Sequence, residues 1–572
     1  MATTRQTEIE RKYDVEDGGG LPDLSGIEGV GSVETRKAVT LEAVYVDTER
    51  GDLARAAITM RRRSGGKDAG WHVKLPAGAG RTEVHAPLDD GTIEGDEVTA
   101  PAGLLDAVRL VVRGRPLVPV ARIRTRRTAL ILHDASGREV AEVADDAVSA
   151  TDLRSGEKRS WHEVEAELLG IDEDGALSEA QDTGAKDDTT KDGGAENDGA
   201  VDGGAEDGGA EDTATDTPRT AESGAALLDA IERALLKAGA VPSASRSKLA
   251  RALGRNDLTD AGEGAVSSSA RSSKRPKTAI DAVTASLRTL VDDLLAADPA
   301  VRRDDTESVH EMRKVVRRLR SVLAASRRVL DREQADALRA RLATLGRVLG
   351  EARDAEVRAA RATTGVDALP ADVGDRRLRN RLIANARRDY RRAHRKLLTF
   401  LSGAEYFGLL DALDEFVAAP PASKRATDPA GKAIRRALEK EVDRSLRRAG
   451  EARSAGAADA LDAQHGARKA ARRLRYVAEA AHAGGGIRSR GDLEKVVALA
   501  AAAEEVQDVL GDHRDASVFA EHVRAESGRA HAAGEQTFGY GVLFSGARRA
   551  ADDAETRADE AIRGLRRAAK KL

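Results

Sequence analysis

Apolar and polar residues alternate with a period of two along residues 1–170. Eight alternating runs are separated by Gly, Pro and Asp residues: TEIERKYDV, LEAVYVDT, AAITMRRR, GWHVKLP, RTEVHAPL, VARIRTRR, REVAEVAD and WHEVEAELL. Short alternating runs bounded by turn residues are typical of antiparallel strands. This part of the chain is therefore expected to form an antiparallel sheet or a closed barrel.

The pattern becomes helical after residue 276, where long stretches rich in Ala, Leu and Arg begin, and the stretch ALLDAIERALLK after Gly224 predicts one further helix. Residues 171–222 repeat DGGAE-like units and hold 17 acidic against 3 basic residues. Such a composition buries too little apolar surface to offset chain entropy, so this tract is predicted to be disordered. The expected class is an α+β multidomain protein. Its parts are a sheet domain over 1–262 with an acidic insertion at 171–222, a linker at 263–276 and an all-α domain over 277–572.

The net charge of −4 argues at first against a polyanion partner, but it averages unlike segments. Residues 276–572 alone carry 57 Lys and Arg against 45 Asp and Glu. The absence of cysteine excludes a disulfide scaffold, a thiolate metal site and a cysteine nucleophile. No apolar run approaches the roughly 20 residues that span a bilayer, and the first residues lack a signal-peptide core, so we expect a cytoplasmic location.

Strand parity sorts the charged residues of the first part. Residues i and i+2 share a face, which places Glu8, Glu10 and Lys12 together. The same spacing groups Arg61 with Arg63, His72 with Lys74, Arg81 with Glu83 and His85, Arg122 with Arg124 and Arg126, and Glu163 with Glu165 and Glu167. A sheet with one solvated face would explain the pattern of charged residues on any one strand. Across all of them, however, glutamates gather on the first and last strands and cations between, which favours a barrel that holds a metal-bound polyphosphate chain.

These motifs resemble the CYTH domain of the triphosphate tunnel metalloenzymes. The run Glu8-Ile9-Glu10-Arg11-Lys12 matches the family signature E-x-E-x-K, and Tyr45 to Thr48, Trp71 to Pro76 and Arg81 to Glu83 match later strands. The resemblance implies an eight-stranded tunnel with Glu8, Glu10 and Lys12 as catalytic residues. It implies substrate binding by Lys12, Arg61, Arg63, Lys74, Arg81, Arg122 and Arg124. It implies Mg²⁺ or Mn²⁺ held by Glu8, Glu10 and the glutamates of WHEVEAELL, which are Glu163, Glu165 and Glu167, with Glu142 and either Asp146 or Asp145 completing the site.

A repeated pattern marks the helical part. Counting from His310, cations stand at +3, +4, +7, +8 and +10, and the same offsets recur from His465, 155 residues later. The two sets are Arg313, Lys314, Arg317, Arg318 and Arg320, then Arg468, Lys469, Arg472, Arg473 and Arg475. Two Arg-Asp pairs repeat 161 residues apart, Arg353-Asp354 and Arg514-Asp515. At about 100° per residue the cations share one helix face and apolar residues the other, which favours an anion site over a solvated face.

These residues resemble the CHAD domain, the conserved-histidine helical domain, over about 280–572. The resemblance implies two pseudo-symmetric helical bundles and a basic groove that binds inorganic polyphosphate. His310 and His465 would lie at the groove with Arg313, Lys314, Arg317, Arg320, Arg468, Lys469, Arg472 and Arg475, and Arg353 and Arg514 would orient or join them. Aromatic residues, which stack on bases in nucleic-acid readers, are scarce in this part, which favours polyphosphate over nucleic acid.

The sequence thus predicts a metal-dependent triphosphatase joined to a polyphosphate-binding module, with no membrane partner. The alternatives are a non-catalytic polyphosphate-binding or granule-associated protein, an adenylate cyclase, and a thiamine triphosphatase. The acidic insertion is either an inert loop or a competitor for the tunnel cations. Substrate choice, metal preference and oligomeric state stay open at this point.

Overall fold

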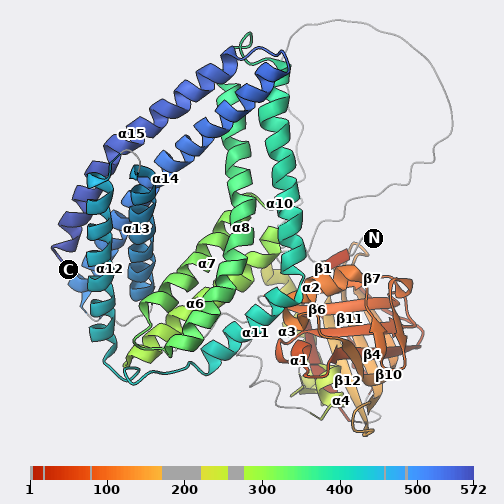
Figure 1. Ribbon diagram of the computed structural model, residues 1–572. Helices are drawn as coiled ribbons and strands as arrows, with labels where there is room; N and C mark the ends of the chain where they lie inside the picture. Colours follow the sequence, from red (N-terminus) through yellow and green to blue (C-terminus); the bar gives the residue numbers. More distant parts are fainter. Residues whose placement is uncertain are drawn as a thin grey trace, which may run out of the picture. The chain divides into compact units, whose positions relative to one another are not determined.

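A computed structural model describes residues 4–16, 20–77, 80–170, 221–245, 247–254, 276–456, 459–483, 487 and 489–572. The acidic tract predicted to be disordered and the predicted linker therefore lie outside the described residues, apart from residues 221–222 and residue 276. The chain divides into two compact units, residues 1–269 and 270–572 (Figure 1). The first is an antiparallel sheet with short helices and the second is helical, as the alternation and the later helical periodicity predict.

Every alternating run of the sequence is a strand of one sheet in the first unit. The strands are β1 (Thr4–Glu8), β2 (Glu10–Val15), β3 (Ser32–Thr35), β4 (Val39–Thr48), β5 (Thr59–Ser64), β6 (Gly70–Ala77), β7 (Gly80–Ala86), β10 (Leu117–His133), β11 (Glu139–Asp152), β12 (Lys158–Leu168) and β13 (Val241–Pro242). A separate hairpin joins β8 (Thr92–Glu94) to β9 (Glu97–Thr99). The helices are α1 (Asp52–Arg55), α2 (Ala102–Val112), α3 (Ala221–Lys237) and α4 (Lys248–Ala252).

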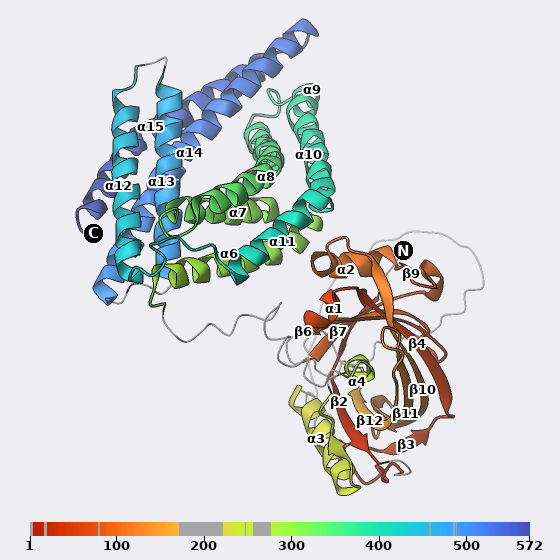
Figure 2. The ribbon, with the colours of Figure 1, turned by 60° about the horizontal axis from the view of Figure 1, so that its bottom comes forward.

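The strand order is β1-β7-β6-β5-β4-β10-β11-β12-β2-β13, with β3 paired to β10, and all pairings are antiparallel. Only Ile9 separates β1 from β2. Within this short run, Glu8 lies opposite Arg81 of β7 and Glu10 lies opposite Glu167 of β12. The two strands of this first run therefore stand at or next to the opposite ends of the strand order. The strands curve around a common interior (Figure 2).

The two faces of this sheet differ in polarity. Val164, Ala166 and Leu168 of β12 are buried against Leu228 and Ile231 of α3. Figure 2 shows α3 beside β2 and β12, outside the curve of the sheet. Likewise β6 buries Trp71 and Val73 in a cluster with Leu104 and Val108 of α2. Alternation then directs the intervening residues of both strands, which are charged, to the opposite side. We call these two sides the apolar face and the charged face.

The second unit consists of two successive groups of helices. The first group is α6 (Ala279–Arg302), α7 (Ser308–Ala325), α8 (Arg332–Asp367), α9 (Arg376–Arg379), a π-helical turn at Asn380–Ala384, α10 (Asn385–Leu401) and α11 (Ala404–Ala418). The second group is α12 (Ala430–Ser454), α13 (Ala460–Ala483), α14 (Arg490–Ala532) and α15 (Phe538–Ala569). The two predicted histidine-arginine helices are α7 and α13, and the two Arg-Asp pairs lie on α8 and α14.

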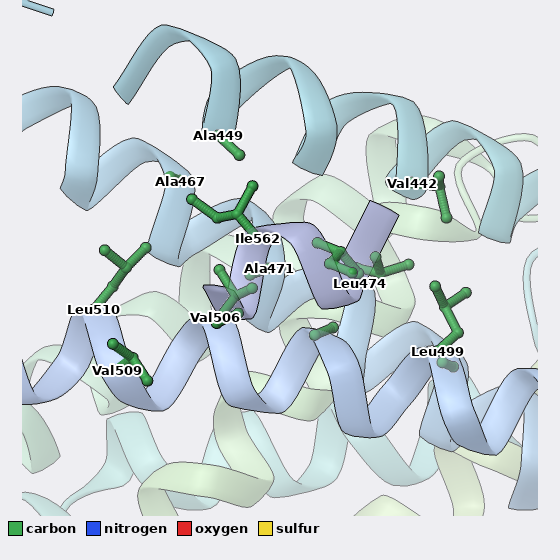
Figure 3. Packing of buried hydrophobic residues seen from close by; sticks show 14 of the residues in the cluster. Val442, Ala449, Ala467, Ala471, Leu474, Leu499, Val506, Val509, Leu510 and Ile562 are labelled. Carbon is green, nitrogen blue, oxygen red and sulfur yellow. The ribbon is translucent and has the colours of Figure 1, made fainter. Parts of the chain in front are cut away.

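The predicted apolar back of each histidine-arginine helix forms part of a core. Met312, Val315, Val316 and Leu319 of α7 are buried, as are Ala467, Ala470, Ala471 and Leu474 of α13. Figure 3 shows Ala467, Ala471 and Leu474 packed against Val506 and Leu499 of α14. Burial of this stripe leaves the opposite face of α7 and α13 to the cations, as helical periodicity requires.

Candidate functional sites

The charged face brings together residues from eight strands. Direct cross-strand partners share a face, and the register pairs Glu8 with Arg81, Glu10 with Glu167, and Lys12 with Glu165. It also pairs Lys74 with Glu83, Arg61 with His72, and Arg127 with Asp146. Most of the residues that the sequence analysis assigned to metal and phosphate binding therefore lie on one side of one sheet.

A group of buried carboxylates occupies the β11–β12 part of this face. Asp146, Glu163 and Glu165 each offer an oxygen, and these oxygens lie within 4.8 Å of one another. Lys248 of α4 places its Nζ 3.0 Å from Asp146 and 2.7 Å from both glutamates. Arg127 of β10 contacts Asp146 at 2.7 Å and Glu165 at 2.6 Å. Buried cations thus compensate this group, as buried charges require.

The carboxylates nearer β1 have a different electrostatic environment. Burial raises the pKa of Glu8 to about 8, helped by Glu83 and opposed by Lys74, whose Nζ lies 2.5 Å from Glu8. Burial and the neighbouring carboxylates Glu10 and Glu165 raise the pKa of Glu167 to about 7. Negative charge is therefore under-compensated at Glu8 and Glu167, and an added cation there would favour their ionised forms.

Stronger cationic neighbours govern the two carboxylates beside Lys12. Burial alone would raise the pKa of Glu10, but Lys12 and Lys74 lower it below its ordinary value. Burial of Glu165 is likewise outweighed by Lys12, Lys248 and Arg127, which hold its pKa well below the usual range. Lys12 contacts both carboxylates, at 3.3 Å from Glu10 and more closely at Glu165. Lys12 therefore links the two carboxylate groups.

Cations surround a pocket beside these carboxylates. Its lining includes Arg61, Arg63, Arg127 and Lys248, together with Tyr45 and other residues of β4 and β10. Burial, together with the positive charges of Arg61 and Arg127, lowers the pKa of Arg63 to about 9. Arg61 donates to the Tyr45 hydroxyl at 3.3 Å. Nearby anionic groups outweigh burial and raise the pKa of Arg61, Arg127 and Lys248, so Arg63 is the lining cation whose charge its surroundings oppose. A buried cation in that position favours an anionic ligand.

Three assigned residues lie on the other face of their strands. Arg122 and Arg124 are exposed, and the side chain of Arg124 is 66% exposed and lies 3.7 Å from Glu42. On β10 the charged face carries Ile123, Thr125 and Arg127 instead, because the strand has the opposite parity to the one predicted. Asp145 bonds His162 on the apolar face, so Asp146, and not Asp145, lies on the charged face with the glutamates. The predicted parity of β10 and the assignment of Asp145 were wrong.

Two cations of the charged face, Arg127 and Lys248, were not among the predicted site residues. Glu163 belongs to the run WHEVEAELL, whose glutamates the resemblance assigned to the metal. Arg127 was missed because only the register to β11 shows which arginines of β10 meet Asp146. Lys248 follows the acidic tract and lies in a five-residue helix. The packing of Leu249 and Ala252 against Tyr45, Ile123 and Trp161 places α4 on this face, and no local pattern near Lys248 indicates that position.

The helical unit gathers arginines from both repeats. Burial lowers the pKa of Arg317 to about 9, with further lowering by Arg313, Arg472 and Arg468. Burial also lowers the pKa of Arg472 to about 10, with Arg468, Arg313 and Arg320 adding to the effect. Arg514 of α14 is a further positive neighbour of Arg313. The predicted repeat thus becomes one cluster of like charges where α7 and α13 meet.

Both histidines stand beside this arginine cluster. Burial, and then the charge of Arg353, lower the pKa of His310, while burial and the cations Lys469 and Arg514 lower that of His465. Neutral imidazoles are therefore favoured at neutral pH in the absence of an anion. Arg353 is 2.8 Å from Glu307 and 2.9 Å from Glu356, and Arg475 is 2.7 Å from both Glu479 and Glu504. The candidate cations thus differ in how far carboxylates compensate them.

Family models match both units. The CYTH domain model matches residues 6–189 and the CHAD domain model matches residues 285–524. The uncharacterized protein Rv2226 of Mycobacterium tuberculosis strain H37Rv is 35% identical over 583 residues, which span 99% of this chain and 98% of the relative. The uncharacterized protein MT2285 of strain CDC 1551 matches to the same extent. The chain belongs to the family of proteins that join a CYTH domain to a CHAD domain.

Solved structures of lower identity resemble parts of the chain. PptA from Streptomyces chartreusis is 18% identical, with a TM-score of 0.38, and the match covers 50% of this chain and 99% of PptA. The CHAD domain from the plant Ricinus communis is 24% identical, with a TM-score of 0.39, and the match covers 52% of this chain and 94% of that domain. Among the described helices, none has the length and apolar character needed to cross a membrane.

Proposed function

We propose that the sheet unit hydrolyses inorganic triphosphate or a related triphosphate with the help of Mg²⁺ or Mn²⁺. The observation that carries the proposal is the charged face, where under-compensated carboxylates adjoin a pocket lined by Arg61, Arg63, Arg127 and Lys248. Membership of the CYTH family supports it, since metal-dependent chemistry is typical of that domain. Carboxylates and cations in separate groups suit a metal and a chain of phosphate oxygens respectively.

The donor set fits a hard divalent cation. Glu8, Glu10 and Glu167 would hold it, because they supply carboxylate oxygens and because two of them have raised pKa values that a cation would reverse. Glu142 lies opposite Glu167, and Asp146 and Glu165 adjoin the same face. Bound metal would polarise a phosphoryl oxygen and promote ionisation of water.

The protein's own cations would position the substrate. Arg61, Arg63 and Arg127 can neutralise charge that develops on phosphoryl oxygens, and their buried setting strengthens this effect. Lys74 and Arg81 approach Glu8 and Glu10 from β6 and β7, so they can hold a terminal phosphate beside the metal ligands. A linear triphosphate along this face would contact both groups of cations.

We further propose that the helical unit binds inorganic polyphosphate. The arginine cluster of α7, α13 and α14 is under-compensated, and a polyanion would remove the repulsion within it. Tyr476 is already flanked by Arg318 and Arg475, whose guanidinium carbons lie 5.7 and 5.6 Å from its ring centre. Tyr390 bonds Asp304 and stacks on His394. These contacts leave the two tyrosines poorly placed to stack on bases, which supports polyphosphate over nucleic acid.

A non-catalytic polyphosphate-binding protein is the second candidate. It is favoured by Asp146, Glu163 and Glu165, which already have Lys248, Arg127 or Lys12 as partners. In that case the charged face would serve as a second anion site. An adenylate cyclase or a thiamine triphosphatase has no comparable support in the described residues, where the pocket lined by the four cations offers no aromatic pair for a base or a thiamine ring.

Phosphate release tests the proposal directly. Purified full-length protein is assayed on triphosphate, long-chain polyphosphate, ATP and thiamine triphosphate with Mg²⁺ and with Mn²⁺. We expect release from triphosphate, and we expect Glu8→Gln or Glu10→Gln to lower it at least about 100-fold, since metal ligands are lost. Glu42→Gln on the exposed side of β4 is the matched control and should retain full rate. No release from any substrate would favour the binding protein, and full activity of Glu8→Gln would exclude the metal site.

A further inference from the structure

The two repeats of the helical unit compensate equivalent cations differently. In the first repeat, all three cations near the histidine have carboxylate partners. The pairs are Arg313 with Asp354 at 3.5 Å, Lys314 with Glu311 at 2.5 Å, and Arg353 with Glu307 at 2.8 Å and Glu356 at 2.9 Å. Positive charge at this end of the first repeat is therefore largely neutralised within the protein.

The equivalent cations of the second repeat form no such pairs. Within the described residues, Arg468, Lys469 and Arg514 have no carboxylate partner, and Arg468 instead donates to the Gln507 carbonyl at 3.4 Å. The sequence explains the difference at two positions. Gly466 stands where the first repeat has Glu311, and Ser517 stands where it has Glu356. The histidine end of the second repeat therefore keeps its positive charge.

The asymmetry reverses at the far end of the two helices. Arg475 of α13 has two carboxylate partners, Glu479 and Glu504, each at 2.7 Å. Its equivalent on α7, Arg320, has no carboxylate partner in the described part of the chain, and its Nε is buried without a hydrogen bond. Here the first repeat keeps its charge and the second does not.

The central arginines connect these two ends. Arg317 and Arg472, one from each repeat, have no ion pair within the described residues. Arg472 is close enough to interact electrostatically with Arg468 on one side and Arg320 on the other. The uncompensated cations therefore form a continuous series that starts in the second repeat and ends in the first.

We propose that a linear polyanion binds along this diagonal series rather than symmetrically across both repeats. The series, which we call the track, consists of Lys469, Arg514, Arg468, Arg472, Arg317 and Arg320. This inference rests on the proposed polyphosphate binding and specifies which half of each repeat takes part. A cation that already holds a carboxylate gains less from a phosphate, because one contact is exchanged for another and the carboxylate repels the ligand. Lys314, Arg353 and Arg475 therefore lie off the track.

Matched substitutions in the two repeats test the track. The full-length protein is titrated with labelled long-chain polyphosphate at several salt concentrations. Lys469→Gln should weaken binding roughly tenfold and reduce the slope of log K against log salt by about one, because one phosphate contact is lost. Lys314→Gln, the equivalent change in the first repeat, should alter the affinity by less than about twofold. Equal losses in the two variants would overturn the track.

A transfer of carboxylates gives a test that leaves every cation in place. Ser517→Glu supplies the partner that Arg514 lacks, and Gly466→Glu does the same for Lys469. A Cβ at Gly466 meets only Arg448 Cδ at 3.8 Å, so the residue fits. Both variants should weaken polyphosphate binding several-fold, whereas Glu356→Gln in the first repeat should leave it equal or tighter. Unchanged affinity in both glutamate variants would contradict the proposal.

The outcomes separate this inference from the proposed function. Failure of the unaltered protein to bind polyphosphate would overturn both. Binding with equal losses in Lys314→Gln and Lys469→Gln would overturn the track alone and leave polyphosphate binding intact. Thermal unfolding followed by circular dichroism shows whether each variant is folded. If Lys469→Gln is unfolded, Gly466→Glu replaces it in the comparison.

Discussion

At the scale of single residues, environment decides which charges are available to a ligand. Glu165 and Glu167 lie on the same face of β12, two residues apart, yet cations depress the pKa of the first and burial raises that of the second to about 7. The same contrast separates Arg353 with its two carboxylate partners from Arg514. Residue type alone therefore does not identify the groups that face a metal or an anion.

Arg63 and Arg124 provide a direct residue-scale prediction. The side chain of Arg63 is 8% exposed and lines the cationic pocket, whereas that of Arg124 is 66% exposed on the other face of the sheet. Arg63→Gln should lower kcat/KM for triphosphate by roughly 100-fold through loss of a buried charge-assisted contact. Arg124→Gln should stay within about twofold. Steady-state kinetics of the two variants measure this difference. Equal losses of kcat/KM would show that Arg124 also contributes to the site.

At the scale of elements, two alternating patterns explain most of the architecture. Period-two alternation accounts for all strands from β1 to β12 that form the charged face, and period 3.6 accounts for the buried backs of α7 and α13. Alternation does not reveal which of the two parities on β10 faces Asp146, because both contain arginine, Arg122, Arg124 and Arg126 on one and Arg127 on the other. The bulge in the β4–β10 pairing at Pro119 and Ala121 shifts the register, and such a shift is not visible in the strand's own sequence.

Close approach between helices gives an element-scale prediction. A Cβ on Gly511 of α14 would lie 3.0 Å from Nη2 of Arg468, and the equivalent Gly350 of α8 stands 3.4 Å from Nη2 of Arg313. Gly511→Ala should displace the Arg468 guanidinium and weaken polyphosphate binding several-fold. The same change should raise or maintain thermal stability, since Ala favours a helix interior by about 1 kcal/mol over Gly.

Gly528→Ala on the same helix is the matched control for this change. A Cβ at Gly528 meets no atom within 4 Å, so the variant should gain helix stability without loss of affinity. Thermal melts and polyphosphate titrations on both variants provide the comparison. Loss of affinity in Gly528→Ala equal to that in Gly511→Ala would show that the effect does not depend on Arg468.

At the scale of the whole molecule, two units with different ligand requirements share one chain. In the described residues, the buried carboxylates Asp146, Glu163 and Glu165 lie in the sheet unit, whereas the anion site proposed for the helical unit consists of cations and two histidines. Covalent linkage raises the local concentration of a polymer held by one unit near the other. The near-zero net charge of −4 conceals this organisation because it sums the two units and the acidic tract.

Chelation should separate the two activities. EDTA is expected to abolish phosphate release from triphosphate, because the metal is needed for the reaction, and excess Mg²⁺ should restore it. Binding of long-chain polyphosphate by the full-length protein should change by less than about twofold, because arginine and lysine need no metal to hold phosphate. Parallel release and titration measurements check both parts, and loss of polyphosphate binding on chelation would contradict the assignment to the helical cluster.

The sequence by itself determined the division into a strand part and a helical part, the internal repeat and most of the charged residues of both sites. These features follow from local periodicity and from side-chain chemistry, which are properties of short stretches of chain. Only the tertiary structure decided that Arg127 and Lys248 join the carboxylates, that Asp146 rather than Asp145 does so, and that the two repeats compensate their cations unequally. Those facts depend on register and on packing between distant segments, and a partner's position is not encoded next to the residue it neutralises.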